Sequence, residues 1–98
     1  MIVHTVWFRL RHPRGSAEET AFLTDSFALS AIPGLIDFQR HSEVSPKNDF
    51  HFGFTMSFAD QAAYTSYDQH PTHVAFVEDR WKAEVEDFLE IDHVPLGA

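Results

Sequence analysis

The stretch Phe50-His-Phe-Gly-Phe-Thr-Met-Ser-Phe58 decides the fold, because apolar residues alternate along it with small or polar ones. Period-two alternation is typical of a β-strand, in which successive side chains point to opposite faces of a sheet. One face would carry four phenylalanines and a methionine, which must be shielded from water. The stretch is therefore predicted to be a strand with this face buried in the core.

Three other segments are predicted to join this strand in a sheet. Ile2–Leu10 alternates with His4 in its apolar set, and Val85–Val94 alternates until Pro95 ends it. Leu35–Val44 is also expected to be extended. These segments contain β-branched and aromatic residues, which pack well on a pleated surface. Four strands are therefore expected.

Helices are predicted between the strands from the signals at their ends. Ser16 and Glu19 have the spacing of a capping box, in which each side chain covers the other's backbone N–H. The helix that they open is expected to stop at residues 33–34, a Pro-Gly pair. Asp60 is predicted to cap a second helix, and Pro71 fits the first position of a third.

The order of these elements predicts the fold class. A β-α-β-β-α-α-β chain is typical of an α+β, ferredoxin-like protomer, in which helices cover one face of a four-stranded antiparallel sheet. The other face of the first strand is not strongly polar, because it carries Val3 and Trp7. We therefore expect a second subunit to cover that face in a symmetric homodimer.

Length and composition set further limits. The 98 residues are predicted to form a single domain, residues 1–98. The chain has no cysteine and opens without the basic region of a signal peptide, so a cytoplasmic protein is expected. Its formal net charge of −8 argues against nucleic acid or a membrane surface as a partner, because both attract clustered Lys and Arg.

The stretch Tyr67–Val77 holds the residues with the most distinctive chemistry. His73 falls in the first turn of the helix that Pro71 opens, on the same face as Phe76 and Val77. A helix N-terminus and apolar neighbours both oppose a charged ring, which favours the neutral imidazole that a general base requires. The hypothesis is that His73 removes a proton beside a substrate carbonyl, while Tyr67 donates a hydrogen bond to an oxygen.

Structural roles are the alternatives for these residues. His73 would then be a core histidine bonded to a backbone carbonyl or to Tyr67, and Tyr67 would be a packing aromatic. His4, among apolar neighbours, needs a partner that is either structural or chemical. His70 is expected to be a helix cap or a surface residue.

Three motifs resemble the stress-responsive α/β-barrel (Dabb) family: Ile2-Val-His4-Thr-Val-Trp-Phe8, Ile32-Pro33-Gly34 and Tyr67-x-x-His70-Pro71-x-His73-Val74. The resemblance extends from the first strand to Pro95. It implies a ferredoxin-like protomer whose sheet meets that of a second copy to form a dimeric α/β barrel. It also implies a pocket between the sheet and the helices.

The resemblance implies roles for individual residues. A plant polyketide cyclase of this family uses a histidine and a tyrosine that match His73 and Tyr67, with a supporting histidine that matches His4. A further pocket histidine of that cyclase matches Phe52, while His51, one residue away, would face the other side of the sheet. This departure argues against the same substrate. The expected ligand contacts are Val6, Phe8, Phe22, Phe52, Phe54 and Val77.

Three functions are compatible with the sequence. The first is a cofactor-free enzyme, a cyclase or isomerase, acting on an aromatic or polyketide-like molecule in an apolar pocket. The second is a non-catalytic, stress-related dimer or ligand-binding module in which phenylalanines fill the space. The third is a cofactor-free monooxygenase, for which Trp7 and Trp81 are available. No cofactor or metal is predicted, since the four glycines are scattered and the histidines lack the spacing of a metal motif.

Overall fold

The computed structural model describes residues 1–97, so Ala98, the last residue of the predicted domain, lies outside the described residues. The predicted β-α-β-β-α-α-β order is confirmed. The elements are β1 (Ile2–Leu10), α1 (Ala17–Asp25), the 3₁₀-helix η1 (Ser26–Ala31), β2 (Ile36–Ser42), β3 (Phe52–Phe58), α2 (Gln61–Gln69), α3 (Pro71–Phe76), the π-helical turn η2 (Val77–Trp81), α4 (Lys82–Glu84) and β4 (Val85–His93).

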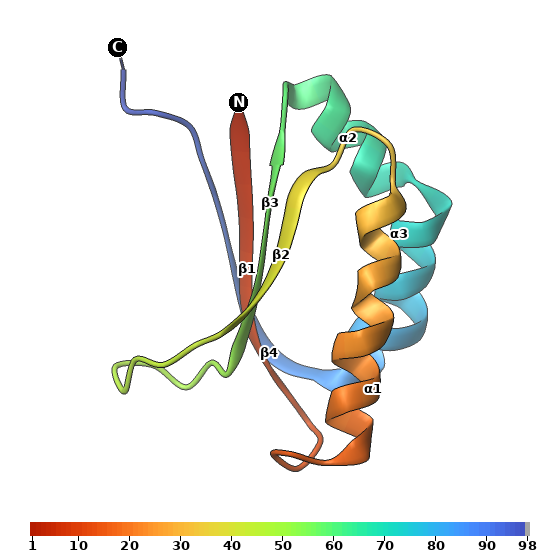
Figure 1. Cartoon of the computed structure of the whole chain (residues 1–98), viewed down its shortest axis with the longest axis vertical. Coiled ribbons are helices and arrows are strands. Elements are labelled where there is room, and N and C mark those ends of the chain that lie inside the picture. Colours follow the sequence, from red (N-terminus) through yellow and green to blue (C-terminus); the bar gives the residue numbers. More distant parts are fainter. Residues whose placement is uncertain (98) are drawn as a thin grey trace.

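The four strands form one antiparallel sheet in the order β2-β3-β1-β4. Strands β1 and β3 are therefore central, and β2 and β4 form the edges. Figure 1 shows the helices together on one side of this sheet, while the opposite face is uncovered. This is the α+β, ferredoxin-like arrangement that the order of the elements predicts.

The hydrophobic core lies between the sheet and the helices. Alternate residues of β1 and β3 point into it, as the alternation in the sequence predicts. Phe8 has no exposed surface. It packs against four aromatic rings at centroid distances between 4.8 and 5.9 Å: Phe22, Phe52, Phe54 and Trp81.

Strand β3 begins two residues later than the sequence predicts. Phe50 lies in the preceding loop, where its N–H donates to Asn48 Oδ1 at 2.9 Å, and its side chain is partly exposed. The next residue, His51, makes a backbone bond to Phe8 O at 2.9 Å. The prediction that Phe50 is buried with the other phenylalanines is therefore wrong, because the asparagine side chain turns the chain before it enters the sheet.

The start of α1 differs in one bond from the predicted capping box. Ser16 Oγ accepts the Glu19 N–H at 3.2 Å, as expected. The Glu19 carboxylate, however, accepts the N–H of Gly15 at 3.0 Å, while the Ser16 N–H donates to Pro13 O at 3.1 Å. The turn before the helix already satisfies the N–H of Ser16, so the glutamate bonds one residue earlier. The helical segment then ends at Ala31, and Ile32, its C-cap, is extended immediately before Pro33.

The caps of α2 and α3 fix the segment that carries the distinctive tyrosines and histidines. Asp60 Oδ1 accepts the Ala63 N–H at 2.9 Å and opens α2. His70 Nδ1 accepts the Thr72 N–H at 3.1 Å, and Pro71 takes the first position of α3. The prediction that His70 is a helix cap is confirmed. Because both starts are capped, the positions of the side chains on α2 and α3 are well defined.

The open face of the sheet is partly apolar. The Trp7 indole lies against the backbone of Gly53, so closely that a Cβ added there would come within 2.1 Å of the indole Cε3. On β4, Leu89 and Ile91 leave 48% and 47% of their surface exposed. Large apolar side chains on a solvent-facing sheet indicate a surface that another molecule covers.

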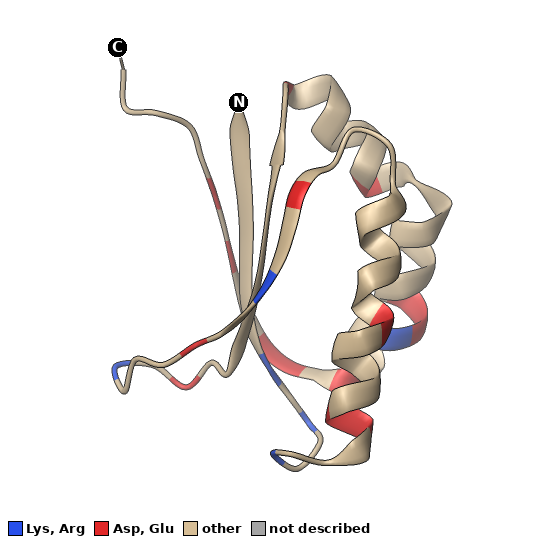
Figure 2. Ribbon diagram, viewed as in Figure 1, with Lys and Arg blue, Asp and Glu red and all other residues tan. Residues whose placement is uncertain are grey.

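Charges are distributed unevenly over the molecule. The sequence has 15 acidic and 7 basic residues, and Figure 2 shows acidic positions on the helices and along the β4 strand. Among the helices of residues 1–97, none combines the length and the apolar character that crossing a bilayer requires.

Candidate functional site

A cavity of about 340 Å³ opens between the inner face of the sheet and the helices. Two imidazoles and one phenol line it: His4 from β1, His73 from α3 and Tyr67 from α2. The remaining walls are mainly apolar and include Val6, Phe54, Met56, Phe76, Val77 and Trp81. Asp68, Lys82 and Glu90 also border the cavity.

Tyr67 lies near both histidines. Its ring centroid is 4.5 Å from that of His73 and 6.5 Å from that of His4. The residue is only 2% exposed, and no group within residues 1–97 hydrogen-bonds to its hydroxyl. Burial, together with the carboxylates of Asp68 and Glu90, raises the pKa of the Tyr67 hydroxyl well above its ordinary value. The phenol therefore keeps its proton and is a hydrogen-bond donor for whatever occupies the cavity.

The ring of His73 is oriented by a bond to the end of α2. Its Nδ1 lies 3.0 Å from the backbone oxygen of Asp68. Since a carbonyl oxygen only accepts, Nδ1 carries the proton, and in the neutral ring Nε2 has the free lone pair. Within residues 1–97, Nε2 has no protein partner. His73 therefore makes the bond to a backbone carbonyl that a structural role predicts. Its second nitrogen, Nε2, is left available for chemistry.

His4 is held by two side chains that sequence analysis did not identify. Its Nδ1 lies 2.5 Å from Asp92 Oδ1 and 2.7 Å from the hydroxyl of Tyr64. The Tyr64 hydroxyl also donates to Asp92 Oδ2 at 2.8 Å. Burial, followed by this bond to Asp92, raises the pKa of Tyr64, so the phenol stays protonated. His4 is only 6% exposed, and the bonds at Nδ1 supply the partner that a buried imidazole requires.

The structure brings together part of the predicted set. His4, Tyr67 and His73 border one cavity, and so do the predicted ligand contacts Val6, Phe54 and Val77. Phe8, Phe22 and Phe52 do not border it among residues 1–97; they fill the core, where their exposures are 0%, 0% and 8%. Aromatic packing against one another takes these three rings away from the cavity wall.

Tyr64 and Asp92 are the functional candidates that sequence reasoning missed. Asp92 stands directly opposite His4 in the pairing of β4 with β1. That register depends on tertiary pairing, which no local pattern in the sequence reveals. A weak signal existed for Tyr64, which lies one helical turn before Tyr67 and so occurs on the same side of α2.

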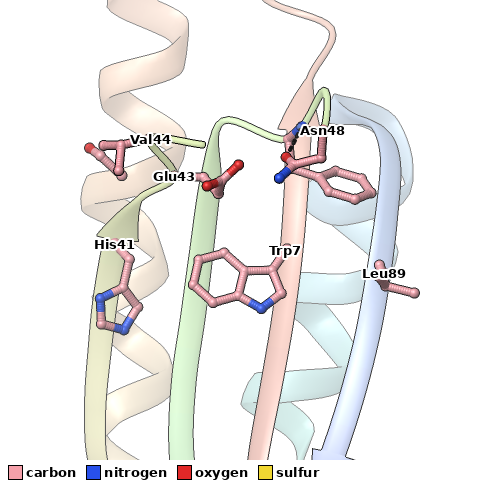
Figure 3. A pocket seen from close by; sticks show the side chains of 8 residues that line it. Trp7, His41, Glu43, Val44, Asn48 and Leu89 are labelled. Atoms are coloured by element: carbon pink, nitrogen blue, oxygen red, sulfur yellow. Dashed lines mark hydrogen bonds between the residues drawn. The ribbon is translucent and has the colours of Figure 1, made fainter. Parts of the chain in front are cut away.

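The two tryptophans lie on opposite sides of the sheet. Trp81 borders the cavity, 5.0 Å from Phe8 between ring centroids. Trp7 instead lines a shallow hollow of about 490 Å³ on the open face. Figure 3 shows this hollow, with the indole between His41 on β2 and Leu89 on β4, below the loop that carries Glu43 and Asn48.

The other histidines of residues 1–97 do not border the cavity. His12 Nε2 lies 2.7 Å from a Glu84 carboxylate oxygen, and His41 Nε2 lies 2.7 Å from Thr55 Oγ1. Burial and the nearby Arg14 lower the pKa of His51. Among residues 1–97, no group of three or more histidine, cysteine or acidic side chains is arranged to hold a metal ion.

The fold and the cavity define a ferredoxin-like protein with a small apolar site carrying imidazole and phenol groups. The sequence pattern of the stress responsive A/B barrel domain (Dabb) family matches residues 2–95. The chain therefore belongs to this family, as its three motifs predict. Among curated proteins, none matches the chain.

Solved structures agree with this assignment. The chain is 61% identical to a Dabb family protein with a ferredoxin-like fold from Mesorhizobium loti, with a TM-score of 0.97; the match covers 98% of this chain and 97% of that one. A dimeric ferredoxin-like protein from Thermobifida fusca is 18% identical, with a TM-score of 0.79 and coverage of 95% and 89%. A hydroxynitrile lyase from Passiflora edulis is 12% identical, with a TM-score of 0.82 and coverage of 99% and 95%. At these low identities the last two matches show a shared fold.

Proposed function

We propose that this Dabb protein is a cofactor-free acid–base enzyme, a cyclase or isomerase acting on an aromatic or polyketide-like molecule. One observation carries the proposal: one apolar cavity is lined by His4, Tyr67 and His73, and the Tyr67 hydroxyl and both Nε2 atoms have no protein partner within residues 1–97. A proton acceptor beside a hydrogen-bond donor is what the removal of a proton next to a carbonyl requires.

Each polar group has a role in this reaction. His73 removes a proton from the carbon next to a substrate carbonyl, using Nε2 as the base. The electron pair of the broken C–H bond moves towards the carbonyl oxygen, which accepts a hydrogen bond from Tyr67. His4 orients the substrate. Protonated His73 then returns the proton to the product, so the cycle consumes no co-reactant.

The cavity wall supports a ligand that is compact and largely apolar. Its volume of about 340 Å³ lies near the lower end of the roughly 300–1,000 Å³ range of small-molecule sites. Val6, Phe54 and Val77 supply apolar contacts, and the single phenol donor suits one carbonyl oxygen. An aryl ketone is the simplest molecule with these properties.

Proton exchange tests the proposal without knowledge of the natural substrate. We would incubate the protein with acetophenone and 4-hydroxyacetophenone in D₂O and follow loss of the methyl proton signal by NMR. Exchange faster than in buffer is expected for the wild-type protein. His73→Ala should reduce the catalysed rate by about 10²-fold or more, the usual contribution of a general base.

A matched control is available on the open face. His93→Ala removes a histidine from β4 at a position that does not border the cavity, and it should leave the exchange rate unchanged. Undiminished exchange in folded His73→Ala, or no exchange with either ketone in the wild-type protein, would contradict the proposed function.

We further propose that the functional unit is a homodimer joined through the open face of the sheet. The exposed apolar surface of Leu89 and Ile91 supports this assembly. Several similar structures are described as dimeric, including those from Thermobifida fusca and Bacteroides fragilis. The cytoplasmic location expected from the sequence remains a prediction.

A further inference from the structure

We propose that Asp92 and Tyr64 are positioning residues that hold His4 as a second proton acceptor of the cavity. Through them the ring presents an unprotonated Nε2, which accepts a hydrogen bond or a proton from a hydroxyl group of the bound ligand. The inference deepens the proposed function and rests on it for the chemistry. It names the substrate class as a hydroxyaryl ketone, with a carbonyl for Tyr67 and a hydroxyl for His4.

Three side chains, His4, Tyr64 and Asp92, share two protons. His4 Nδ1, the Tyr64 hydroxyl and the Asp92 carboxylate converge within 2.5 to 2.8 Å of one another. An ionised carboxylate only accepts hydrogen bonds. The phenol donates its one proton to Asp92 Oδ2, so the proton between His4 and Asp92 Oδ1 belongs to Nδ1. A neutral ring with Nδ1 protonated has its lone pair on Nε2.

The surroundings keep this arrangement rigid. His4 and Asp92 are directly opposed residues of neighbouring strands, so the sheet itself fixes their separation. The Tyr64 ring stacks on Phe58, with centroids 4.8 Å apart and an interplanar angle of 16°. The same burial that raises the pKa of Tyr64 keeps the phenol a donor. A ring held by a carboxylate in this way is both orientated and fixed in one tautomer.

His4 lines the cavity and, among the described residues, has one nitrogen free. The residue borders the cavity, and Nε2 has no protein partner within residues 1–97. Nε2 is not fully buried either, so a ligand can contact it. If the ligand hydroxyl ionises, its O–H bond breaks, the oxygen keeps the electron pair and the proton forms an N–H bond at Nε2. The ligand recovers the proton before it leaves.

Imidazole nitrogen NMR gives the direct test. In ¹⁵N-labelled protein above neutral pH, His4 should show a protonated Nδ1 and an unprotonated Nε2. Asp92→Asn and Tyr64→Phe should each shift the ring towards the other tautomer. Asp87→Asn, the same change on the same strand but paired with Arg9, should leave the His4 signals unchanged.

Ligand affinity gives the second readout. Wild-type protein should bind 4-hydroxyacetophenone about 3–10-fold more tightly than 4-methoxyacetophenone, the usual range for one hydrogen bond. This preference should disappear in Asp92→Asn and Tyr64→Phe, and persist in Asp87→Asn. If Asp92→Asn fails to fold, Tyr64→Phe still tests the positioning of His4. This substitution removes only the hydroxyl oxygen, so the variant should fold.

The outcomes separate this inference from the proposed function. A wild-type His4 protonated on Nε2, or a tautomer unchanged in both variants, would overturn the positioning role whatever the enzyme does. Equal binding of the two ketones would overturn the hydroxyl preference alone. Failure of both ketones to bind would instead count against the cavity as a ligand site, and would overturn the hydroxyaryl ketone with it.

Discussion

At the scale of single residues, Gly53 shows how one missing side chain shapes the open face. Its Cα lies under the Trp7 indole, and an added Cβ would meet ring atoms at 2.1 to 2.8 Å. No real Cβ contact is that short, so the indole would have to move away. The glycine therefore lets the indole lie flat on the sheet, where it forms the floor of the hollow in Figure 3.

We predict that Gly53→Ala displaces Trp7 and lowers the free energy of unfolding by about 1–3 kcal/mol, the usual range for overpacking. Denaturant unfolding measures the loss, and a change in tryptophan fluorescence reports the displaced ring. In a Trp7→Leu background, where the indole is gone, the same alanine should have little effect. An equal loss in both backgrounds would show that the glycine matters for another reason.

At the scale of secondary-structure elements, the cap of α2 supports the site. Asp60 accepts the Ala63 N–H, and the helix that it opens carries both Tyr64 and Tyr67. Fraying of this end would loosen the two phenols together. The capping residue Asp60, which can be recognised in the sequence, therefore stabilises the helix that positions Tyr64 and Tyr67.

We predict that Asp60→Ala destabilises the protein by about 1 kcal/mol, the typical effect of losing an N-cap. For a domain of this size that corresponds to a fall in Tm of roughly 4–8 °C, measured by thermal unfolding. Asp60→Asn keeps a side-chain acceptor and should retain most of the stability. Equal losses for alanine and asparagine would rule out the capping bond as the cause.

A network of charges joins three other elements. Arg80 in η2 bonds Glu84 and Asp25, both at 2.5 Å, and Glu84 also bonds His12. Burial alone would raise the pKa of Glu84, but the bonds from Arg80 and His12 outweigh it and hold that pKa below its ordinary value of 4.5. The end of the long helical segment is thereby tied to α1 and to the loop after β1.

This lowered pKa predicts a dependence of stability on pH. The unfolded chain takes up a proton at Glu84 before the folded chain does, so the stabilisation is present above about pH 4.5 and is lost as the pH falls below it. The difference in unfolding free energy between wild type and Glu84→Gln should shrink from pH 6 to pH 3. Glu78→Gln, which removes an exposed partner of Lys82, should show a much smaller change.

At the scale of the whole molecule, the sheet has one face packed against helices and one face uncovered (Figure 1). The uncovered face carries Trp7, Leu89 and Ile91, which are large apolar side chains. Water contact with such a surface is unfavourable, and a second copy with the same surface can cover it by two-fold symmetry.

We predict that the wild-type protein has the mass of a dimer in sedimentation or light-scattering measurements. Ile91→Asp should yield folded monomer at the same concentration, because a carboxylate would be buried against an apolar surface. Val74→Asp places the same charge on α3, where the residue is 45% exposed compared with 47% for Ile91, and should leave the dimer intact. A monomeric wild-type protein would refute the proposed assembly.

The sequence by itself determined the strands, the helix starts and the covered face. Alternation along residues 52–58 places successive side chains on opposite faces of a strand, and caps such as Asp60 act on backbone atoms three residues away. These signals are local, because the repeat of a strand and the first turn of a helix are properties of short segments. Local patterns also identified His4, Tyr67 and His73, which border the cavity.

Only the tertiary structure decided which inward-facing residues fill the core and which border the cavity. Phe8 and Phe54 have the same pattern in the sequence, yet Phe8 is enclosed by other rings while Phe54 reaches the cavity. Asp92 meets His4 because β4 pairs with β1 in one register, 88 residues apart in the chain. Such pairings depend on how whole elements pack, and packing is decided by all their side chains together.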